Sequence, residues 1–372
     1  MKISYIANSS FPSHVPSSLQ IVKTCEYLSK KNNQVTLVIP NTPQSKISIF
    51  NFYDVNFKFN VIRMLRFKNF PLGFKYYLFS ILSFFKAYRF SELVISRNYF
   101  VIFLCVVFRK KCIFEIHHEI KVEARIVKFL YKIINIFDNA KLIKIVAISN
   151  AIKKKYIKDF KIKNSKKIIV LPSGTSLKMK FSNLKIKKKL NLGYFGSLNY
   201  SKGIGTIIKL ARMDKNNNYY IYGGMKYQVA EINRKFRSNN LKVFSHQNYK
   251  KLPKLLSDMD ILLMPYSKSV TAAGNVSDIT LYTSPLKLFD YMAAGKTIVC
   301  SNIKVFREVV KDRKNCIIIK NFSNTQNWLM EINKIKNNFY LRNILAKNCL
   351  RDINTFHHNK RIDKYLEGLK WY

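Results

Sequence analysis

The strongest candidate for phosphate chemistry is a loop that runs from Gly196 to Gly203 and contains Lys202. The loop follows a short apolar run and precedes a helical pattern, which is where a strand leads into a helix. Glycines let a ligand approach the backbone, a helix start supplies unpaired N–H groups, and Lys202 adds a positive charge. These features favour a diphosphate ligand, although the loop is neither a Walker P-loop nor a GxGxxG fingerprint. The alternative is a Lys202 that simply extends into solvent.

A second segment, residues 282–295, has the pattern of a short capped helix. Ser284 is a good N-cap, Pro285 suits the first helical position, and Gly295 suits the end. The predicted buried stripe consists of Leu286, Phe289, Met292 and Ala293.

Asp290 places a carboxylate within this helix, whose positive end would point at a ligand. The alternative is that Asp290 simply pairs with Lys287, three positions earlier.

Two other patterns suggest metal ligands. Asp258 and Asp260 form a D-x-D pair, but Asp260 opens an apolar run and hard cations need several convergent oxygens. The histidines show neither HExxH nor Cys/His spacing, and the pair His357-His358 is expected at the surface. We therefore expect no metal site.

Apolar runs alternate with helical patterns along the first half of the chain, as in parallel α/β sheets. A strand at residues 2–7 precedes a polar loop and a helix in which Ser17 and Gln20 have capping-box spacing. One face of this helix is expected to be buried and consists of Ile21, Val22, Cys25 and Leu28. Further strands are expected at residues 35–39, 93–96, 113–116, 142–148 and 168–172.

A second series follows the basic stretch at residues 178–189, which we interpret as a linker. Its strands are expected at residues 190–195, 219–222, 241–244, 261–264 and 297–300. Its helices are expected at residues 203–212, 252–256 and 284–294. In open α/β sheets, ligands bind beyond the carboxyl ends of the strands, where both candidate loops fall.

The order of elements predicts two Rossmann-like domains of the α/β class. The N-terminal domain would span residues 1–180 and the C-terminal domain residues 181–355. Residues 356–372 form a C-terminal segment that could be a helix returning to the N-terminal domain.

The composition describes a folded and very basic protein. The 372 residues include 66 Lys plus Arg against 20 Asp plus Glu, a formal charge of +46. Hydrophobic residues make up 48%, which excludes a disordered polybasic chain because such chains lack the apolar surface that offsets ordering entropy. The charge favours anionic partners, which include nucleic acid, a membrane surface and phosphorylated small molecules. The sequence has no zinc finger, RNP-type aromatic pair or basic recognition helix, so nucleic acid is not the expected partner.

Cysteine usage and hydropathy indicate a cytoplasmic protein. The six cysteines show no CxxC motif, which predicts reduced and mostly buried thiols. The first 14 residues lack the apolar core and cleavage site of a signal peptide. The longest apolar run, residues 99–108, is shorter than the roughly 20 residues that a membrane-spanning helix needs.

Blocks of sequence in a fixed order resemble the family 4 glycosyltransferases, which have the GT-B fold. The second half contains GYFGSLNYSKG, YIYGG, SDMDILLMPY, GNVSDITLYTSPLKLFDYMAAGKTIVCS, REVV and NCIII. The first half contains FEIHHE, VAISNAI and VLPSG in the corresponding order. The resemblance covers nearly the whole chain and implies two Rossmann-like domains that face each other across a cleft. It implies that residues 1–180 bind the acceptor and residues 181–355 bind the nucleotide sugar. It also implies transfer of a sugar from a nucleoside diphosphate donor, with retention at the anomeric carbon and without a bound metal.

The resemblance assigns roles to single residues. Lys202 matches the diphosphate-binding lysine, Asp290 the second acid of the E-x7-E signature, which holds the donor ribose, and His117 the histidine near the reacting sugar. His117 and Lys202 are therefore the expected catalytic residues. The expected donor-binding residues are Gly196, Ser197, Lys202, Gly203, Ser284, Pro285, Leu286 and Asp290. No cofactor is expected besides the nucleotide sugar, which is a co-substrate.

Two positions depart from the family pattern. The arginine that normally precedes the lysine falls on Ser197, so one counter-charge to the leaving diphosphate is missing or comes from elsewhere. The first acid of E-x7-E, which contacts sugar hydroxyls, falls on Tyr282. The candidates for sugar contact are Asn275, Ser277, Asp278 and Tyr282.

The sequence thus predicts a hexosyltransferase-like, metal-independent enzyme that acts on a glycan or lipid-linked glycan in cell-surface polysaccharide or lipopolysaccharide biosynthesis. The aromatic and basic segment 67–79 and the basic run 121–132 suit docking on the anionic inner face of the cytoplasmic membrane, where each basic residue adds roughly 1 kcal/mol. The alternative is that residues 67–79 pack as an ordinary core helix. Two other functions stay open, a basic nucleic-acid-binding protein and a GT-B protein that binds a nucleotide sugar without efficient transfer.

Overall fold

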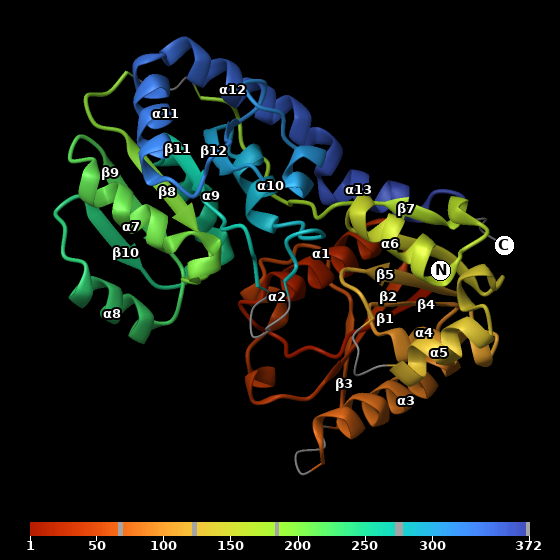
Figure 1. The fold of residues 1–372 in the computed structure, drawn as a ribbon. Helices are drawn as coiled ribbons and strands as arrows, with labels where there is room; N and C mark the ends of the chain where they lie inside the picture. Colours follow the sequence, from red (N-terminus) through yellow and green to blue (C-terminus); the bar gives the residue numbers. More distant parts are fainter. Residues whose placement is uncertain (66–69, 121–124, 183–185, 272–277, 370–372) are drawn as a thin grey trace. The chain divides into compact units, whose positions relative to one another are not determined.

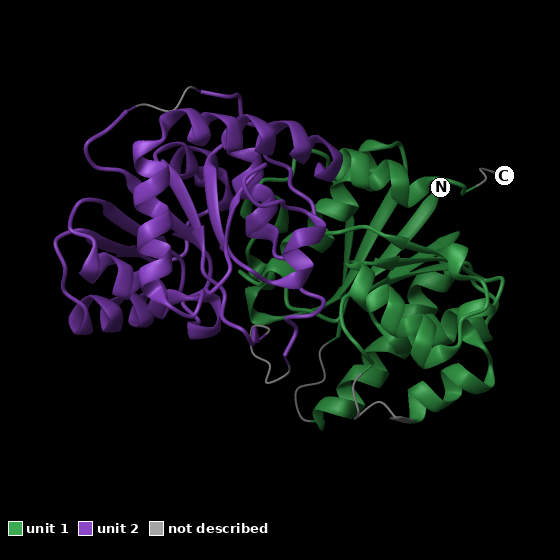
Figure 2. Ribbon diagram, turned by 45° about the horizontal axis from the view of Figure 1, so that its top comes forward, with its two compact units in different colours: residues 1–172, 358–372 green, residues 173–357 purple. Residues whose placement is uncertain are grey.

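The computed structural model describes the chain except for residues 66–69, 121–124, 183–185, 272–277 and 370–372 (Figure 1). It divides into two compact units (Figure 2). The N-terminal unit consists of residues 1–172 and 358–372, and the C-terminal unit of residues 173–357. Each unit contains one parallel sheet with helices packed on it.

Within the described residues, the N-terminal unit contains a seven-stranded sheet in the order β3-β2-β1-β4-β5-β6-β7. Every pair of neighbouring strands is parallel. The strands are β1 (Lys2–Ile6), β2 (Gln34–Pro40), β3 (Asn60–Met64), β4 (Leu93–Ser96), β5 (Cys112–Ile116), β6 (Leu142–Ala147) and β7 (Ile168–Val170). The chain starts in the middle of the sheet, adds β2 and β3 on one side, and crosses to β4 on the other, so the order reverses between β1 and β4.

All six strands predicted for this half lie within two residues of the observed bounds, and the prediction for β4 matches residue for residue. The strand β3 was missed. It is an edge strand whose residues are exposed or half-buried, so it lacks the continuous apolar run that marks a buried parallel strand.

The helices of the N-terminal unit are α1 (Pro16–Lys30), α2 (Ile49–Phe52), α3 (Leu72–Phe90), α4 (Tyr99–Val107), α5 (Arg125–Ile133), α6 (Asn150–Phe160) and α13 (His358–Leu366). The expected cap of α1 by Ser17 is wrong, because the N-cap position is Val15 and Pro16 is the first helical residue. Proline suits that position because its fixed φ is already helical and its missing N–H would have no intrahelical partner. The predicted apolar face of α1 is buried as expected.

The helix α13 packs against α1 in this unit. Ile362, Tyr365 and Leu366 of α13 join the same apolar cluster as the buried face of α1. The expectation that His357 and His358 lie at the surface is wrong, because His357 is half-buried and His358 is buried against α1. His358 is 2% exposed, and its ring lies 5.6 Å from the ring of Tyr27 on α1.

Within the described residues, the C-terminal unit contains a six-stranded sheet in the order β10-β9-β8-β11-β12-β13. The strands are β8 (Asn191–Phe195), β9 (Asn218–Tyr222), β10 (Leu241–Phe244), β11 (Ile261–Met264), β12 (Thr297–Ser301) and β13 (Ile317–Ile319). All pairings are parallel, and the order reverses between β8 and β11. The predictions for β10 and β11 match residue for residue, and the expected fold of two Rossmann-like parallel sheets is confirmed.

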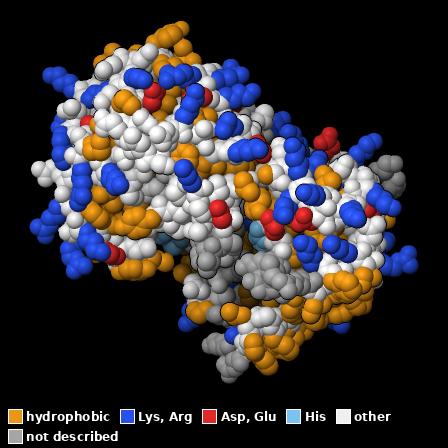
Figure 3. Space-filling view, in the orientation of Figure 1, with side chains coloured by type: hydrophobic (Ala, Val, Ile, Leu, Met, Phe, Trp, Pro, Cys, Tyr) orange, Lys and Arg blue, Asp and Glu red, His pale blue; other side chains and the backbone are white. Residues whose placement is uncertain are grey.

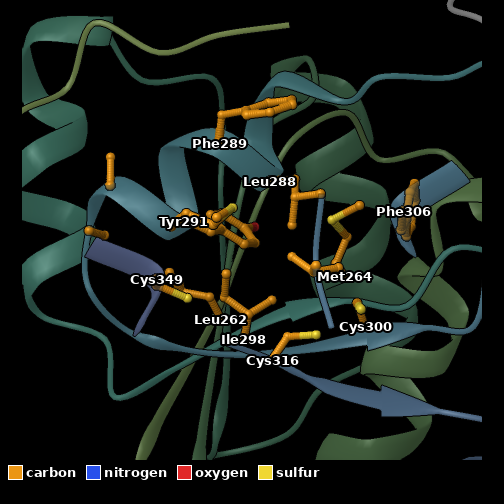
Figure 4. Packing of buried hydrophobic residues seen from close by; sticks show 14 of the residues in the cluster. Leu262, Met264, Leu288, Phe289, Tyr291, Ile298, Cys300, Phe306, Cys316 and Cys349 are labelled. Atoms are coloured by element: carbon orange, nitrogen blue, oxygen red, sulfur yellow. The ribbon is translucent and has the colours of Figure 1, made fainter. Parts of the chain in front are cut away.

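The helices of the C-terminal unit are α7 (Ile204–Met213), α8 (Lys226–Lys235), α9 (Leu252–Ser257), α10 (Leu286–Ala293), α11 (Thr325–Asn337) and α12 (Phe339–Asp352). Two apolar clusters cover the two faces of the sheet, one with α10 and one with α7 and α11. Figure 4 shows Leu288 and Tyr291 of α10 on the side of the helix toward Leu262 and Ile298 of the strands, and Phe289 on the other side. This packing fixes α10 over the middle of the sheet.

All six cysteines are buried and unpaired, which confirms the prediction of buried thiols. Cys300, Cys316 and Cys349 lie in the cluster beneath α10 (Figure 4). Among the described residues, no helix is both long and apolar enough to cross a membrane.

Candidate functional site

The loop that follows β8 runs from Gly196 to Gly203 and is called the Gly196 loop below. It lies where the order of the C-terminal sheet reverses, which is where open α/β sheets bind ligands. A short 3-10 turn, η5 (Tyr200–Lys202), connects it to α7, and the side chain of Asn199 caps this turn through the Ser201 N–H at 2.9 Å. Gly203 has φ 86°, and a Cβ atom there would lie 1.8 Å from the carbonyl oxygen of Pro265. Only glycine fits, so the backbone is held close to the end of β11.

Lys202 folds back onto this loop. Its Nζ donates a 2.9 Å hydrogen bond to Oγ of Ser197, and the residue is half-buried. Burial lowers the pKa of Lys202. Ser197, which falls where the resembled family has an arginine, thus accepts a hydrogen bond from Lys202, which matches that family's diphosphate-binding lysine.

The helix α10 begins differently from the prediction. Its N-cap position is Pro285 and its first residue is Leu286, so Ser284 is not the cap. The hydroxyl of Ser284 instead accepts the Ser173 N–H at 2.8 Å, and the Ser173 hydroxyl donates to the Ser284 carbonyl at 2.8 Å. The expected end of the helix is confirmed, because Gly295 follows the C-cap with φ 58°.

The predicted buried stripe of α10 is incomplete. Phe289, Met292 and Ala293 are buried, but Leu286 is only half-buried. Leu288 and Tyr291 are also buried, because both the sheet and the segment around Phe356 pack on this helix.

Asp290 is 8% exposed, and its Oδ1 accepts a 2.6 Å hydrogen bond from the hydroxyl of Thr175. Burial raises the pKa of Asp290 to about 7, against the opposing effect of hydrogen bonds from Thr175 and Tyr249. A carboxyl group held in this way can accept hydrogen bonds from ligand hydroxyls when it is ionised.

The alternative that Asp290 pairs with Lys287 is wrong for the described residues. Lys287 lies near the end of β8, where its Nζ is 3.7 Å from the ring centroid of Tyr194. A Cβ atom added at Gly196 would lie 2.5 Å from this Nζ. Asp290 therefore contacts Thr175, whereas Lys287 lies beside the Gly196 loop.

A hydrogen bond joins the two candidate segments. The backbone N–H of Phe195, at the end of β8, donates to the hydroxyl of Tyr291 on α10 at 2.7 Å. This bond and the contact of Lys287 with Gly196 bring the two segments together at one edge of the sheet. Sequence reasoning missed Thr175, Tyr291 and the position of Lys287. The only local signals were the VLPSG block that precedes Thr175 and the position of Lys287 in the first turn of α10.

The candidates for sugar contact are only partly described. Asn275 and Ser277 lie outside the described residues. Asp278 is exposed, and its Oδ1 accepts the N–H of Thr280 at 2.8 Å and the N–H of Val270 at 3.3 Å, which ties the two sides of this loop together. Tyr282 is half-buried in the turn before α10.

The D-x-D pair lies at the opposite edge of the sheet. Asp260 precedes β11, whereas the Gly196 loop follows the parallel strand β8. The carboxylate of Asp260 pairs with Lys187 at 2.8 Å and accepts the Asn191 N–H at 2.8 Å. Within the described part of the chain, no cluster of three or more His, Cys, Asp or Glu side chains could hold a metal ion.

His117 lies just after β5 in the N-terminal unit, with a side chain that is 19% exposed. Its Nε2 is 3.6 Å from Oε2 of the buried Glu115. Burial, followed by the charge of Arg97, lowers the pKa of His117 to about 3, so the ring is neutral at neutral pH.

Glu115 is the centre of a buried polar cluster at the carboxyl edge of the N-terminal sheet. It accepts hydrogen bonds from the Tyr5 hydroxyl at 2.7 Å, Arg97 Nε at 2.8 Å and Arg361 Nη2 at 3.4 Å. These residues come from β1, the end of β4, β5 and α13. No local pattern predicts this cluster, because Arg361 is 246 positions from Glu115.

Apolar side chains are exposed on two helices of the N-terminal unit. On α5, Ile126, Phe129 and Ile133 are 76%, 64% and 62% exposed, at helical spacing that places them on one side. On α3, Leu72 and Phe74 are 86% and 51% exposed. In Figure 3, hydrophobic side chains gather along the lower right, over this part of the unit.

The two segments predicted to dock on a membrane, residues 67–79 and 121–132, are described in part. Residues 67–69 and 121–124 lie outside the description. The described remainder of 67–79 forms the start of α3, which is exposed at first and becomes buried only at Phe79, so it is not an ordinary core helix.

The chain resembles known proteins in two comparisons. Residues 176–351 match the family described as "Glycosyl transferases group 1". None of the curated protein sequences matches the chain significantly.

Solved structures match over the whole chain at low identity. HepE from Anabaena, crystallised with UDP-glucose, is 15% identical with a TM-score of 0.70, over 98% of this chain and 99% of HepE. Sucrose-phosphate synthase from Thermosynechococcus elongatus is 13% identical with a TM-score of 0.73, over 99% of this chain and 98% of that one. WaaG, a glycosyltransferase involved in lipopolysaccharide biosynthesis, is 15% identical with a TM-score of 0.65, over 98% of this chain and 100% of WaaG.

The GT-B fold is thus confirmed. Residues 176–351, slightly less than half of the chain, are thus similar to the group 1 glycosyl transferases, and the whole chain has the fold of the GT-B structures.

Proposed function

We propose that this chain is a retaining glycosyltransferase that moves a sugar from a nucleoside diphosphate sugar to a glycan or lipid-linked glycan, without a bound metal. The observation that supports it most is the junction of the Gly196 loop with α10, where Phe195 and Tyr291 are hydrogen-bonded. HepE was crystallised with UDP-glucose and WaaG acts in lipopolysaccharide biosynthesis, which favours these classes of donor and acceptor.

Lys202 and the N-terminus of α7 would bind the diphosphate. When the bond between the anomeric carbon and the diphosphate oxygen breaks, negative charge grows on the leaving diphosphate. A half-buried ammonium and the N–H groups at a helix start stabilise that charge more strongly than water does, because they are already oriented. Lys202 therefore acts mainly on the transition state.

Asp290 would bind the donor ribose. An ionised carboxylate has about four lone-pair sites, so the hydrogen bonds from Thr175 and Tyr249 leave capacity for ribose hydroxyls. The bond from Thr175 fixes the orientation of the carboxylate before the donor binds.

His117 would contact the donor sugar as a neutral hydrogen-bonding group. Its pKa of about 3 means that it carries no positive charge at neutral pH. This assignment rests on the resemblance of the FEIHHE block to the family.

The test is a thermal-shift screen with UDP-, GDP- and ADP-sugars, followed by acceptor-dependent release of nucleoside diphosphate with and without EDTA. A ligand that binds the native state raises the melting temperature. We expect one nucleotide class to stabilise the protein, turnover that EDTA leaves unchanged, and a product whose anomeric configuration by NMR equals that of the donor. Stabilisation without turnover by any acceptor would instead indicate a binding protein. Steeply salt-dependent binding of nucleic acid with no response to nucleotide sugars would overturn the proposal.

We also propose that the N-terminal unit binds the anionic inner face of the cytoplasmic membrane, where a lipid-linked acceptor would be found. The exposed apolar side of α5 is flanked by the exposed Lys132, whereas Lys128 pairs with Asp159 at 3.7 Å. Exposed apolar residues with a neighbouring cation suit the boundary between headgroups and acyl chains. In sedimentation with phosphatidylglycerol-containing vesicles, the triple variant Ile126→Ser, Phe129→Ser, Ile133→Ser should bind less than the wild type. The control is Tyr340→Ser, since Tyr340 is a comparably exposed apolar residue of the C-terminal unit. Equal, negligible binding of the wild type to anionic and neutral vesicles would refute membrane docking.

A further inference from the structure

Lys287 has a buried amine that finds no hydrogen-bond partner among the described residues. Its Nζ is shielded from solvent, and no described residue accepts a hydrogen bond from it. It lies 3.7 Å from the ring centroid of Tyr194 and 5.2 Å from that of Tyr266. An ammonium has three donors, and ring faces satisfy them only in part.

The position is electrostatically unfavourable for a cation. Lys287 is the second residue of α10, and the N-terminus of a helix carries a partial positive charge. Burial, and next the charge of Lys202, hold the pKa of Lys287 well below its usual value. Burying an unpaired amine is costly, so the arrangement stabilises neither the helix nor the core by itself.

The same position is favourable if an anion binds to the Gly196 loop. Lys287 Nζ lies beside Gly196, 2.5 Å from where a Cβ atom would be, and the hydroxyl of the neighbouring Ser197 accepts a hydrogen bond from Lys202. Two lysines from different elements thus flank the short backbone segment at which the diphosphate is proposed to bind. A diphosphate carries several negative charges and many acceptor oxygens, so it can satisfy both ammonium groups.

We propose that Lys287 supplies the second positive charge for the diphosphate, in place of the arginine whose position Ser197 occupies. The inference rests on the proposed function, because it takes the Gly196 loop as the diphosphate site. It goes further by naming a residue on α10 that compensates for the departure from the family pattern.

Binding of the diphosphate should then be coupled to protonation. The groups that face Lys287 Nζ are the rings of Tyr194 and Tyr266 and the ammonium of Lys202, and none of them carries negative charge at neutral pH. A bound diphosphate favours the charged amine, so the complex takes up a proton. Affinity for UDP should therefore fall as pH rises, by up to about tenfold per pH unit while the free and bound states differ by one proton.

The experiment is titration calorimetry with UDP, GDP and ADP in two buffers of different ionisation enthalpy, which together report the number of protons taken up. It compares the wild type with Lys287→Met and with Lys209→Met, since Lys209 is exposed on α7. Methionine fills similar space among the aromatic rings, and Lys287→Gln serves as a second variant if the first does not fold.

We expect Lys287→Met to weaken binding of the preferred diphosphate roughly 10- to 100-fold, which is the usual range for one charge-assisted hydrogen bond, and to abolish most of the proton uptake. The melting temperature of the unliganded variant should equal or exceed that of the wild type, because the buried amine is gone. Affinity for the nucleoside without phosphates should not change. Lys209→Met should behave like the wild type.

Two results would overturn the proposal in distinguishable ways. If the wild type binds a diphosphate and Lys287→Met binds it equally well with the same proton uptake, Lys287 is not a ligand and the proposed function still stands. If the folded wild type binds none of the three diphosphates, the proposed function fails and the inference fails with it.

Discussion

The hydroxyl of Thr175 lies 2.6 Å from Oδ1 of Asp290, and both side chains are buried. Thr175 belongs to the segment that follows β7, whereas Asp290 lies 115 positions later on α10. This bond fixes the carboxyl group that is proposed to hold the donor ribose. It also replaces the ion pair with Lys287 that spacing along the helix favoured.

Replacement of Thr175 should therefore affect both stability and donor binding. Thr175→Val keeps the shape but leaves a buried carboxyl oxygen without its donor, so the free energy of unfolding should fall by about 1–3 kcal/mol. The dissociation constant for the nucleotide should rise, because the carboxylate is no longer oriented. Chemical denaturation and calorimetry measure the two effects. Thr175→Ser keeps the hydroxyl and is the matched control, and a Val variant that behaves like it would refute this role.

The raised pKa of Asp290 predicts a specific pH dependence of stability. The pKa is about 7 in the folded protein, whereas an unfolded Asp titrates near 4. The folded state therefore holds this proton more tightly. The protonated Asp290 contributes fully to the free energy of unfolding below about pH 4, and this contribution is lost as pH rises to about 7. Asp290→Asn has no such proton to lose.

The unfolding free energies of wild type and Asp290→Asn should then diverge with pH. The variant should gain up to about 4 kcal/mol relative to the wild type between about pH 4 and pH 7, and the difference should stay constant above that. Urea denaturation at about pH 5 and pH 8 checks this. If the unfolding free energies of the wild type and Asp290→Asn differ by the same amount at both pH values, the pKa of Asp290 is not raised by folding.

The buried cluster around Glu115 predicts the opposite pH dependence. The charge of Arg97 and hydrogen bonding, against the effect of burial, hold the pKa of Glu115 well below its usual 4.5. Its contribution to stability is therefore present above about pH 4.5 and is lost as pH falls through the folded pKa.

Removing that charge should destabilise the N-terminal unit. Glu115→Gln leaves the guanidinium groups of Arg97 and Arg361 buried without their carboxylate, which typically costs about 3–5 kcal/mol. Thermal unfolding near neutral pH measures the loss. The control is Glu231→Gln, because the ion pair of Glu231 with Lys235 is exposed and its removal should leave the melting temperature unchanged. A loss no larger than that of the control would show that the cluster contributes little.

Lys202 is expected to act on turnover more than on binding of the whole donor. Lys202→Ala should lower kcat by roughly 100-fold or more, because the charge on the leaving diphosphate develops in the transition state. Steady-state kinetics with a matched nucleotide sugar measure kcat and KM separately. Lys209→Ala on the neighbouring α7 should retain wild-type kinetics, since that side chain is exposed. Unchanged kcat in Lys202→Ala would exclude Lys202 from the catalytic machinery.

Much of the fold follows from local pattern. The strands β4 and β11 were predicted residue for residue, because a buried parallel strand is a short continuous run of apolar residues between turn signals. The edge strand β10 was also predicted residue for residue, although only Val243 in it is buried. The stop of α10 at Gly295 follows from a single residue that tolerates a left-handed backbone. The burial of all six thiols also follows from their scattered spacing in an apolar chain.

The caps were less predictable, because several polar residues compete for one helix start. Ser17 and Ser284 both have the chemistry of an N-cap, yet α1 is capped at Val15 and α10 at Pro285. In α10 the choice was decided by a remote partner, since the hydroxyl of Ser284 accepts a hydrogen bond from Ser173.

The sequence by itself determined two α/β domains and the two segments whose residues are proposed to bind diphosphate and ribose. Only the tertiary structure decided which side chains meet. Thr175 reaches Asp290, Arg361 reaches Glu115, and Lys287 lies against Gly196 instead of pairing with Asp290. The physical reason is that periodicity reports which face of an element is buried, whereas the partner on that face is set by sheet order and by the packing of segments more than a hundred positions apart.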